Sequence, residues 1–230
     1  MLPVAILAGG LATRLRPATE TIPKALMDIN GEPFLAHQLR LLSRSGIRRV
    51  VFCIGYRGAQ IQDYVRDGSQ FGLQVDYSLD GPRLLGTAGA IHKALPLLGQ
   101  QFFVLYGDSY LPCDYTAIEQ SFLTSGKLAL MTVFRNDGRW DLSNVEFSEG
   151  RIVMYDKTNR TSAMRHIDYG LGVLSSAVFH SLPEDRPHDM ASVYRDLVER
   201  GELAAYEVPE RFYEVGSLDG IREFSSYLSG

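Results

Sequence analysis

Several features are scarce in this 230-residue sequence, and each scarcity excludes a class of protein. There are only two cysteines, Cys53 and Cys113, so a disulfide framework is excluded and a reducing, cytoplasmic setting is expected. Lysine and arginine number 23 against 27 aspartates and glutamates, a net charge of −4, which argues against nucleic-acid binding through bulk positive charge. The first apolar run, residues 2–8, follows no basic leader and is far shorter than the roughly 20 residues of a membrane-spanning helix. We therefore expect neither a targeting signal nor a membrane segment.

The composition that remains is that of an ordinary globular protein. Apolar residues make up 45% and charged residues 22%, which excludes global disorder. The chain contains no internal repeat, low-complexity tract or linker. We therefore expect a single domain over residues 1–230.

The first half of the chain alternates strand-like and helix-like stretches. Short apolar runs predict strands at residues 2–7, 49–54, 73–77 and 101–106. Helical spacing of apolar residues predicts helices at residues 34–44, 59–65 and 87–95. This rhythm predicts an α/β fold, with a Rossmann-like, mostly parallel sheet and helices on both faces.

The second half is richer in strands. Strands are expected at residues 127–134, 142–147, 151–155 and 166–174, the second and third forming a hairpin. Helices are expected at residues 116–123, at residues 192–199 and from Ser217 onward. The strand-rich C-terminal third is expected to return to the same sheet.

The strongest motif follows the first strand, at residues 7–17 (LAGGLATRLRP), with a Pro-Lys pair at residues 23–24. The backbone of a glycine turn at the carboxyl edge of the sheet would face a ligand. The residues of this turn are Leu7, Ala8, Gly9 and Gly10. Side-chain donors follow at Thr13, Arg14, Arg16 and Lys24. This set suits a triphosphate, although the spacing is neither a Walker loop nor a dinucleotide fingerprint. An ordinary glycine turn with solvated arginines would not explain all four donors.

This segment resembles the signature of the sugar-1-phosphate nucleotidyltransferases, Leu-Ala-Gly-Gly-x-Gly-Thr-Arg-Leu-x-Pro followed by a lysine. The resemblance runs through nearly the whole chain. It is strongest to the short members that act as guanylyltransferases on heptose 1-phosphate or as uridylyltransferases on N-acetylmuramate 1-phosphate. It implies the nucleotide-diphospho-sugar transferase fold, Mg²⁺, and the reaction of an NTP with a sugar 1-phosphate to give an NDP-sugar and pyrophosphate. Residues 1–110 would form the nucleotide-binding half and residues 111–230 the sugar-phosphate-binding half.

The resemblance also gives roles to the donors of the motif. It implies that Arg14 and Lys24 are catalytic, because they bind and neutralise the phosphates. Ala12 departs from the family pattern, which has glycine there. Its methyl group would crowd the triphosphate if that position needs a positive φ.

A second motif, residues 84–91 (LLGTAGAI), is expected to cover the nucleotide. Thr87 is placed to cap a helix that begins here. By the resemblance, the backbone of Gly86 contacts the base. A capped surface helix with small packing residues explains the pattern about equally well. Asp80, in the preceding turn, can accept N–H groups from a guanine edge, although a turn aspartate before glycine is common for structural reasons.

Two carboxylates are candidate metal ligands. Asp108 follows the apolar strand at 101–106, where a cation that bridges phosphates would need it. Glu214, in the segment FYEVGS, stands where the family usually has a second metal-binding aspartate. It reaches one methylene further than aspartate. The simpler interpretations are a turn-capping aspartate and a surface glutamate.

The sugar phosphate is expected on residues of the second half. Lys157, in the segment MYDK, resembles the family lysine that holds the sugar phosphate. Gly170 would permit close approach of the sugar, and Asp168 would accept hydrogen bonds from its hydroxyls. For Asp168 and Gly170 only their position supports the role, and a solvated lysine at a hairpin edge is a serious alternative for Lys157.

No general base is evident in the sequence. The five histidines show no metal-ligand spacing: His37, His92, His166, His180 and His188. The reaction requires no general base, because a sugar phosphate has a second pKa of roughly 6 and is already a nucleophile near neutral pH.

Three functions remain open, in decreasing order of support. The first is a nucleotidyltransferase, with GTP and D-glycero-D-manno-heptose 1-phosphate ahead of UTP with an amino sugar or N-acetylmuramate 1-phosphate. The second is a non-catalytic regulator that binds a nucleotide or a sugar phosphate on the same fold. The third, a metal-dependent glycosyltransferase, lacks the usual Asp-x-Asp because position 110 is Tyr110. A monomer or simple homodimer is expected.

Overall fold

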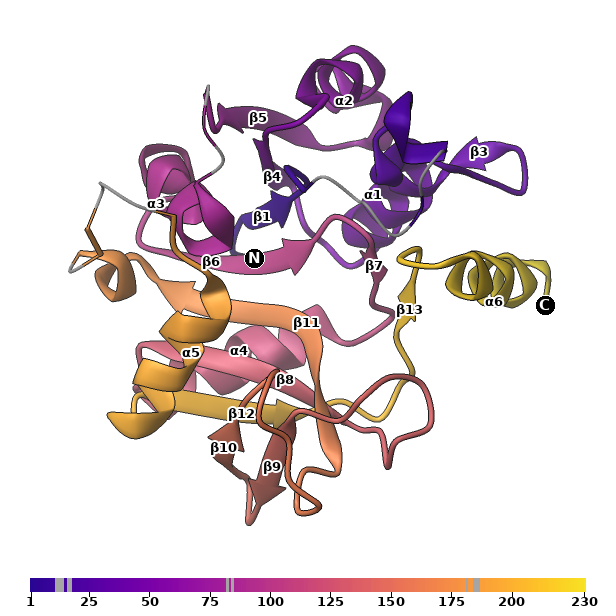
Figure 1. Cartoon of the computed structure of the whole chain (residues 1–230). Coiled ribbons are helices and arrows are strands. Elements are labelled where there is room, and N and C mark those ends of the chain that lie inside the picture. The colour runs from indigo at the N-terminus through magenta and orange to yellow at the C-terminus, as the bar shows by residue number, and fades with distance from the viewer. Residues whose placement is uncertain (11–14, 16–17, 82, 84, 181, 184–186) are drawn as a thin grey trace.

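The structure is a computed structural model that describes residues 1–10, 15, 18–81, 83, 85–180, 182–183 and 187–230. Its centre is one large sheet. The strands of this sheet are β1 (Val4–Leu7), β4 (Arg49–Ile54), β5 (Gln74–Leu79), β6 (Gln101–Tyr106), β8 (Ala129–Arg135), β9 (Val145–Ser148), β10 (Arg151–Tyr155), β11 (His166–Ser175) and β12 (Leu203–Glu207). Across the sheet they lie in the order β5, β4, β1, β6, β11, β8 and β12, and the β9–β10 hairpin pairs with the start of β11 (Figure 1).

The two halves of the chain build the sheet differently. In the first half, β1 pairs in parallel with both β4 and β6, and β4 pairs in parallel with β5. In the second half, β11 is antiparallel to β6 and to β8, and only β12 returns to a parallel pairing, with β8. The predicted α/β fold with a mostly parallel sheet is confirmed, and its strand-rich C-terminal third joins the sheet as expected.

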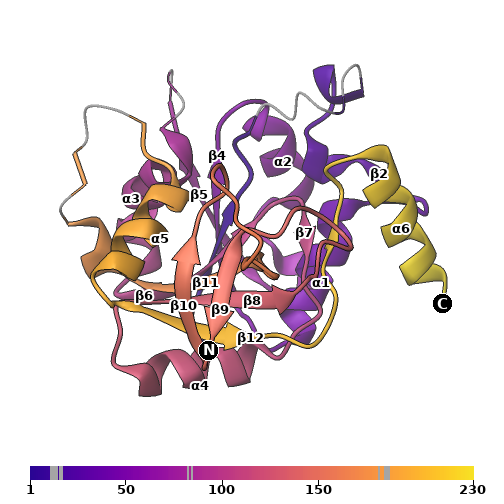
Figure 2. The same ribbon diagram turned by 60° about the horizontal axis from the view of Figure 1, so that its bottom comes forward.

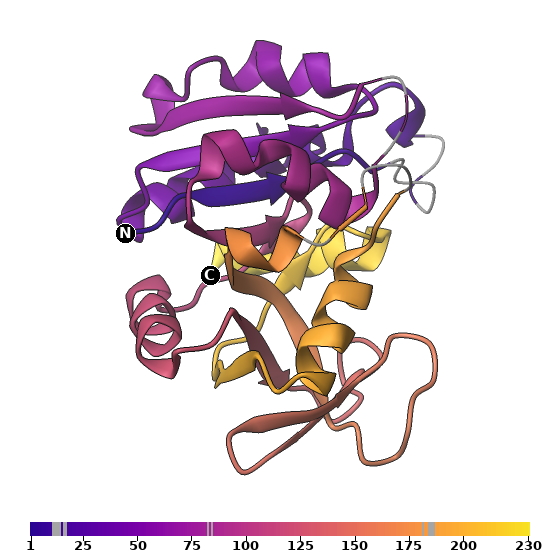
Figure 3. The same cartoon turned by 90° about the vertical axis from the view of Figure 1, so that its left-hand side faces the viewer.

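Helices cover both faces of this sheet. They are α1 (Phe34–Arg44), α2 (Gly58–Val65), α3 (Gly86–Leu98), α4 (Tyr115–Ser125), α5 (Met190–Glu199) and α6 (Leu218–Ser229), with 3-10 turns η2 (Ala18–Glu20), η3 (Lys24–Leu26), η4 (Ser69–Phe71) and η5 (Ser176–Phe179). The buried residues of α1, α2 and α4 share one core, and those of α3 and α5 share the core on the opposite face. Figure 3 shows α3 lying over β1. None of the described helices has the length and apolar content needed to cross a bilayer.

Two short ribbons complete the described elements. They are the hairpin of β2 (Asp28–Ile29) with β3 (Glu32–Pro33), and the antiparallel pair of β7 (Ser109–Tyr110) with β13 (Tyr213–Glu214). Helix α6 stands at the edge of the molecule beside β2 (Figure 2). Its start is capped by Ser217, whose hydroxyl accepts a hydrogen bond from Gly220 N at 3.0 Å.

The buried residue of helix α6 is Phe224, and its ring packs against the rest of the molecule. The ring is fully buried, with its centroid 5.3 Å from the ring of Phe34 and 4.7 Å from that of Tyr110. Tyr110 belongs to β7, and Tyr213 of β13 also contacts Phe224, at 6.0 Å. This cluster therefore holds β13 against β7.

Replacing the anchoring ring should loosen this edge of the molecule. We expect Phe224→Ala to lower the free energy of unfolding by about 3–5 kcal/mol, because it removes a buried aromatic ring and leaves a cavity. Chemical denaturation measures the effect. Leu218→Ala, at an exposed position of the same helix, is the control and should change stability little. Equal stability of the two variants would contradict the anchoring role.

Candidate active site

A pocket of about 280 Å³ opens where β1 and β6 end. Leu7 lies opposite Tyr106 in the parallel register, and Gly107 N donates to Leu7 O at 3.0 Å. The pocket is lined by Leu7, Ala8, Gly9, Gly10, Pro23, Lys24, Ala25, Cys53, Asp80, Gly86, Thr87, Ala90, Tyr106, Gly107, Asp108 and Asp189. The structure therefore brings the turn residues, Lys24, Asp80, Gly86, Thr87 and Asp108 to one place, as the sequence predicts. Ala12, Thr13, Arg14 and Arg16 lie outside the described residues.

The glycine turn is packed closely at one of its positions, where a side chain would push its neighbours aside. A Cβ atom on Gly9 would lie 3.0 Å from Gly55 N, in the turn that follows β4. The same Cβ would lie 3.5 Å from the Asp80 carboxylate. Glycine here lets the turn after β1 rest on the turns that follow β4 and β5, which closes one wall of the pocket.

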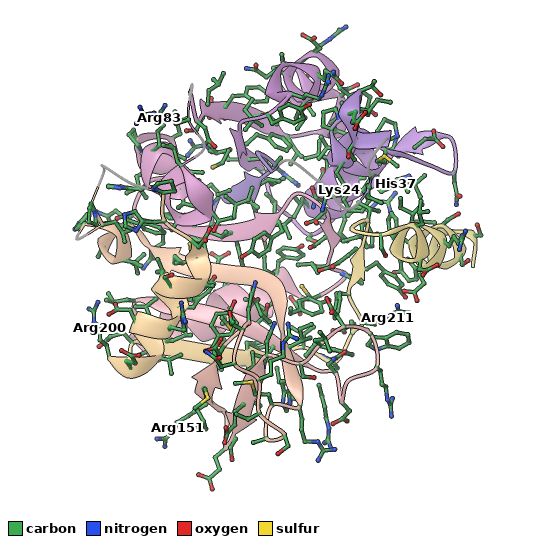
Figure 4. The ribbon with its side chains drawn as sticks, in the orientation of Figure 1. Lys24, His37, Arg83, Arg151, Arg200 and Arg211 are labelled. Carbon is green, nitrogen blue, oxygen red and sulfur yellow. The ribbon has the colours of Figure 1, made fainter. Side chains whose placement is uncertain are left out.

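Lys24 and Asp108 form an ion pair near the C-terminal end of β6. Lys24 follows Pro23 at the start of η3, and Asp108 lies two residues after the end of β6. Their side chains are only 20% and 23% exposed, so solvent screens the pair less than it screens a surface ion pair. In Figure 4, Lys24 lies toward the middle of the molecule, whereas Arg151 and Arg200 lie at its periphery. Lys24 was predicted to bind phosphate and Asp108 to bind a metal ion. In this structure the two side chains neutralise each other's charge.

Glu214 comes from the opposite end of the chain to lie beside the backbone of Asp108, although it is not among the residues that line the pocket. In the pairing of β13 with β7 it lies opposite Ser109, and Val215 N donates to Asp108 O at 3.0 Å. Within the described parts of the chain, no cluster of three histidine, cysteine or acidic side chains could hold a metal. Two carboxylates that leave the remaining positions to phosphate oxygens and water are the ligand set that Mg²⁺ favours. Asp108 and Glu214 therefore fit such an ion.

Asp80 presents a largely buried carboxyl group to the pocket. It is 9% exposed in the turn after β5, and Lys93 Nζ donates to its backbone oxygen at 3.2 Å. Burial raises the pKa of Asp80, whereas a hydrogen bond from the Leu85 N–H and the charge of Lys93 lower it. The carboxyl group is thus partly desolvated, which favours a ligand that can donate to it.

The start of α3 is built differently from the prediction. The helix begins at Gly86 and has no side-chain cap. Its free N–H groups are instead satisfied by the backbone oxygen of His188, which accepts from Ala88 N at 2.8 Å and Gly89 N at 3.3 Å. Gly86 has φ +75, and a Cβ there would lie 2.4 Å from the same oxygen. The approach of His188 therefore requires glycine at position 86.

Thr87 caps a different helix from the one predicted. Its hydroxyl accepts from Met190 N, at the start of α5, at 2.8 Å, and lies 3.5 Å from the carboxylate of Asp189. The prediction that Thr87 caps its own helix is wrong, because the His188 carbonyl takes that place. Because Thr87 caps α5, the carboxylate of Asp189 accepts no hydrogen bond from the N–H groups of that helix, and Asp189 lines the pocket.

The predicted sugar-phosphate residues lie beside Tyr106. Lys157 Nζ is 3.5 Å from Asp168 Oδ2 and 5.5 Å from the centroid of the Tyr106 ring. Gly170 has φ +94 and donates its N–H to Asp168 Oδ1 at 3.1 Å. Because Tyr106 also lines the pocket, the two predicted binding regions are neighbours.

Tyr106 is a site residue that the sequence reasoning missed. Burial raises its pKa, and so do the charges of four carboxylates, those of Asp168, Asp108, Asp189 and Glu214. Its hydroxyl therefore stays protonated and can donate. Its place at the end of a predicted strand, two residues before Asp108, was the available signal, whereas Asp189 belongs to no motif.

With this geometry in place, comparison with known proteins identifies the family. The model of the family described as "Nucleotidyl transferase" matches residues 4–229. The chain belongs to the nucleotidyl transferase family. The resemblance noted from the sequence is thereby confirmed, and so is the expected class of enzyme, because its relatives carry names of sugar-1-phosphate nucleotidyltransferases.

Two curated relatives and one solved structure indicate the range of similarity. An N-acetylmuramate α-1-phosphate uridylyltransferase from Neisseria meningitidis is 42% identical over 117 residues, which cover 50% of this chain and 51% of that protein. A D-glycero-α-D-manno-heptose 1-phosphate guanylyltransferase from Campylobacter jejuni is 26% identical, over 95% of this chain and 96% of its own. The crystal structure of HddC from Yersinia pseudotuberculosis, complexed with GMP-PN, superposes with a TM-score of 0.82 and 24% identity, covering 99% of this chain and 100% of HddC. The similarity to HddC supports the fold of this chain.

The contact between α3 and His188 can be tested by adding one methyl group. We expect Gly86→Ala to lower the free energy of unfolding by about 2–4 kcal/mol, because it combines a strained φ with a clash against backbone. Gly126→Ala is the matched control, with φ +65 and open space around it, and should cost only the strain of about 1–2 kcal/mol. Thermal or chemical denaturation of both variants measures the difference. Equal losses of unfolding free energy in the two variants would show that the backbone at His188 shifts without cost and that its contact does not require glycine at position 86.

Proposed function

We propose that this chain transfers a nucleoside monophosphate from an NTP to a sugar 1-phosphate, releasing pyrophosphate. The observation that carries the proposal is the position of the Lys24–Asp108 pair. It lies in the pocket beside the glycine turn, and Tyr106 joins that pocket to Lys157. A triphosphate on the turn and a sugar phosphate on Lys157 would meet there. Residues 1–110 would then bind the nucleotide and residues 111–230 the sugar phosphate.

The protein contributes to this reaction mainly by positioning the two substrates and by stabilising negative charge on the phosphate groups. A phosphate oxygen of the sugar 1-phosphate attacks the α-phosphorus as the bond to pyrophosphate breaks, in line with the attack. Lys24, together with Arg14, offsets the charge that develops on the phosphoryl oxygens, and Lys157 holds the attacking phosphate. Asp108 and Glu214 would hold Mg²⁺, which when bound neutralises and orients phosphate oxygens. No residue need act as a general base, because the attacking oxygen carries no proton near neutral pH.

GTP and D-glycero-D-manno-heptose 1-phosphate are the substrates we favour. The relative named for this pair aligns over nearly its whole length and nearly the whole of this chain. Asp80 adds a chemical argument: guanine offers two adjacent donors, N1–H and the N2 amine, to a buried carboxylate, whereas uracil offers only N3–H. The 42% identity to the Neisseria uridylyltransferase supports the alternative of UTP with N-acetylmuramate or amino-sugar 1-phosphate.

Pyrophosphate release tests the proposal directly. GTP, UTP, CTP, ATP and dTTP would each be combined with a panel of hexose, heptose and N-acetylmuramate 1-phosphates in the presence of Mg²⁺. We expect release that needs one NTP and one sugar phosphate together, fastest with GTP and the heptose. Nucleotide binding without release from any pair would instead favour a non-catalytic regulator.

The two proposed phosphate-binding cations should matter for turnover rather than for folding. We expect Lys24→Ala or Arg14→Ala to lower kcat by about 10²–10³-fold, the usual cost of removing a donor to a developing charge in a desolvated site. Lys127→Ala changes an exposed lysine in the turn before β8 and is the control. Near-full activity in a folded Lys24 or Arg14 variant would contradict the assigned role.

The carboxylate of Asp80 should determine the preference of the enzyme for guanine over uracil. We expect Asp80→Asn to raise the KM for GTP by roughly tenfold or more relative to that for UTP, because a bidentate contact to guanine is worth about 1–3 kcal/mol. Steady-state kinetics with both nucleotides give the ratio. An unchanged GTP-to-UTP preference would remove Asp80 from base recognition.

A further inference from the structure

Asp168 lies in a setting that leaves little of it for a substrate. Its side chain is only 6% exposed. Oδ1 accepts the N–H of Gly170 at 3.1 Å, and Oδ2 accepts the hydroxyl of Tyr155 at 3.1 Å. Its backbone N–H donates to Asn144 Oδ1 at 2.9 Å, which fixes the main chain at this point of β11. The carboxylate is therefore held from several sides by the protein itself.

Lys157 is the charged group that this carboxylate faces. Its Nζ lies 3.5 Å from Asp168 Oδ2. The same Nζ lies 5.5 Å from the centroid of the Tyr106 ring and 5.9 Å from that of Tyr155, within the range of cation–π attraction. A flexible lysine side chain, 44% exposed, is thus drawn toward the pocket by one carboxylate and two rings.

We propose that Asp168 and Tyr155 are positioning residues, which act on the sugar phosphate only by holding Lys157. The inference rests on the proposed function, since Lys157 is taken as the group that binds the sugar phosphate. It replaces the expectation that Asp168 accepts hydrogen bonds from sugar hydroxyls.

The chemistry of Tyr155 agrees with this arrangement. Burial raises the pKa of its hydroxyl, and the charge of Asp168 raises it further. The hydroxyl therefore keeps its proton and donates it to Asp168. This bond fixes the orientation of Oδ2, the atom nearest to Lys157.

A double-mutant cycle separates positioning from direct contact. We expect Lys157→Met to lower kcat/KM for the sugar 1-phosphate by on the order of 10²-fold, and Asp168→Asn by roughly tenfold, with the KM for the NTP unchanged in both. The double variant should be no less active than Lys157→Met alone, because Asp168 then has nothing to position. Losses that multiply in the double variant would show that Asp168 contacts the sugar itself.

Tyr155→Phe tests the same network with a smaller change. We expect kcat/KM for the sugar phosphate to fall about threefold to tenfold, the effect of losing one hydrogen bond to a charged group. Tyr169→Phe is the matched control, because its hydroxyl is also buried but has no hydrogen-bond partner among the described residues. Equal effects of the two variants would overturn the role of Tyr155.

Chemical labelling gives a readout that does not depend on turnover. Acetic anhydride would be reacted with each folded variant, and acetylation of Lys157 followed by peptide mass spectrometry, with exposed Lys127 as the internal reference. We expect Lys157 to react severalfold faster in Asp168→Asn and in Tyr155→Phe, but not in Tyr169→Phe. Unchanged labelling would contradict the positioning role. Altered labelling in a protein that releases no pyrophosphate would contradict only the proposed function.

Discussion

The parallel pairing of β1 with β6 determines where the other groups of the site lie. Parallel strands end at the same edge of a sheet, so the glycine turn after β1 and Asp108 after β6 are placed side by side. The bond from Gly107 N to Leu7 O fixes this register to the residue. Lys24, which comes back to this edge after the turn, then has Asp108 within reach. A triphosphate site and a carboxylate thus arise from one strand pairing.

The second half of the chain adds the sugar-phosphate side by reversing direction. Because β11 is antiparallel to β6, its N-terminal part, with Asp168 and Gly170, lies at the edge where β6 ends. The β9–β10 hairpin pairs with the same end of β11, and Lys157 follows it. The pairing of β13 with β7 brings Glu214 to Asp108. These segments therefore converge on Tyr106, and the pKa of Tyr106 is raised by Asp168 of β11 and Glu214 of β13, as well as by Asp108 and by Asp189 at the start of α5.

Local sequence predicted the elements that carry strong patterns and missed those that depend on distant partners. The runs of apolar residues and the helical spacing located α1, β4, β6 and β10 at their observed bounds. Strand β12 was missed because its sequence, LAAYE, has no clear alternation, although β8 provides its pairing. Thr87 was given to the wrong helix because the chain that caps α3 comes from His188, about a hundred residues later in the sequence. The glycine turn, Lys24 and Asp108 were found because they lie where predicted strands end, whereas Asp189 has no such signal.

The two substrates are proposed to bind side by side, with Tyr106 between the pocket and Lys157. The most direct test is a crystal structure of the protein with Mg²⁺, a non-hydrolysable GTP analogue and a sugar 1-phosphate. The triphosphate should lie on the turn at Gly9 with Lys24 beside its α-phosphate, and the phosphate of the sugar should contact Lys157. A sugar phosphate bound away from Lys157, or a nucleotide that does not touch the turn, would contradict this arrangement.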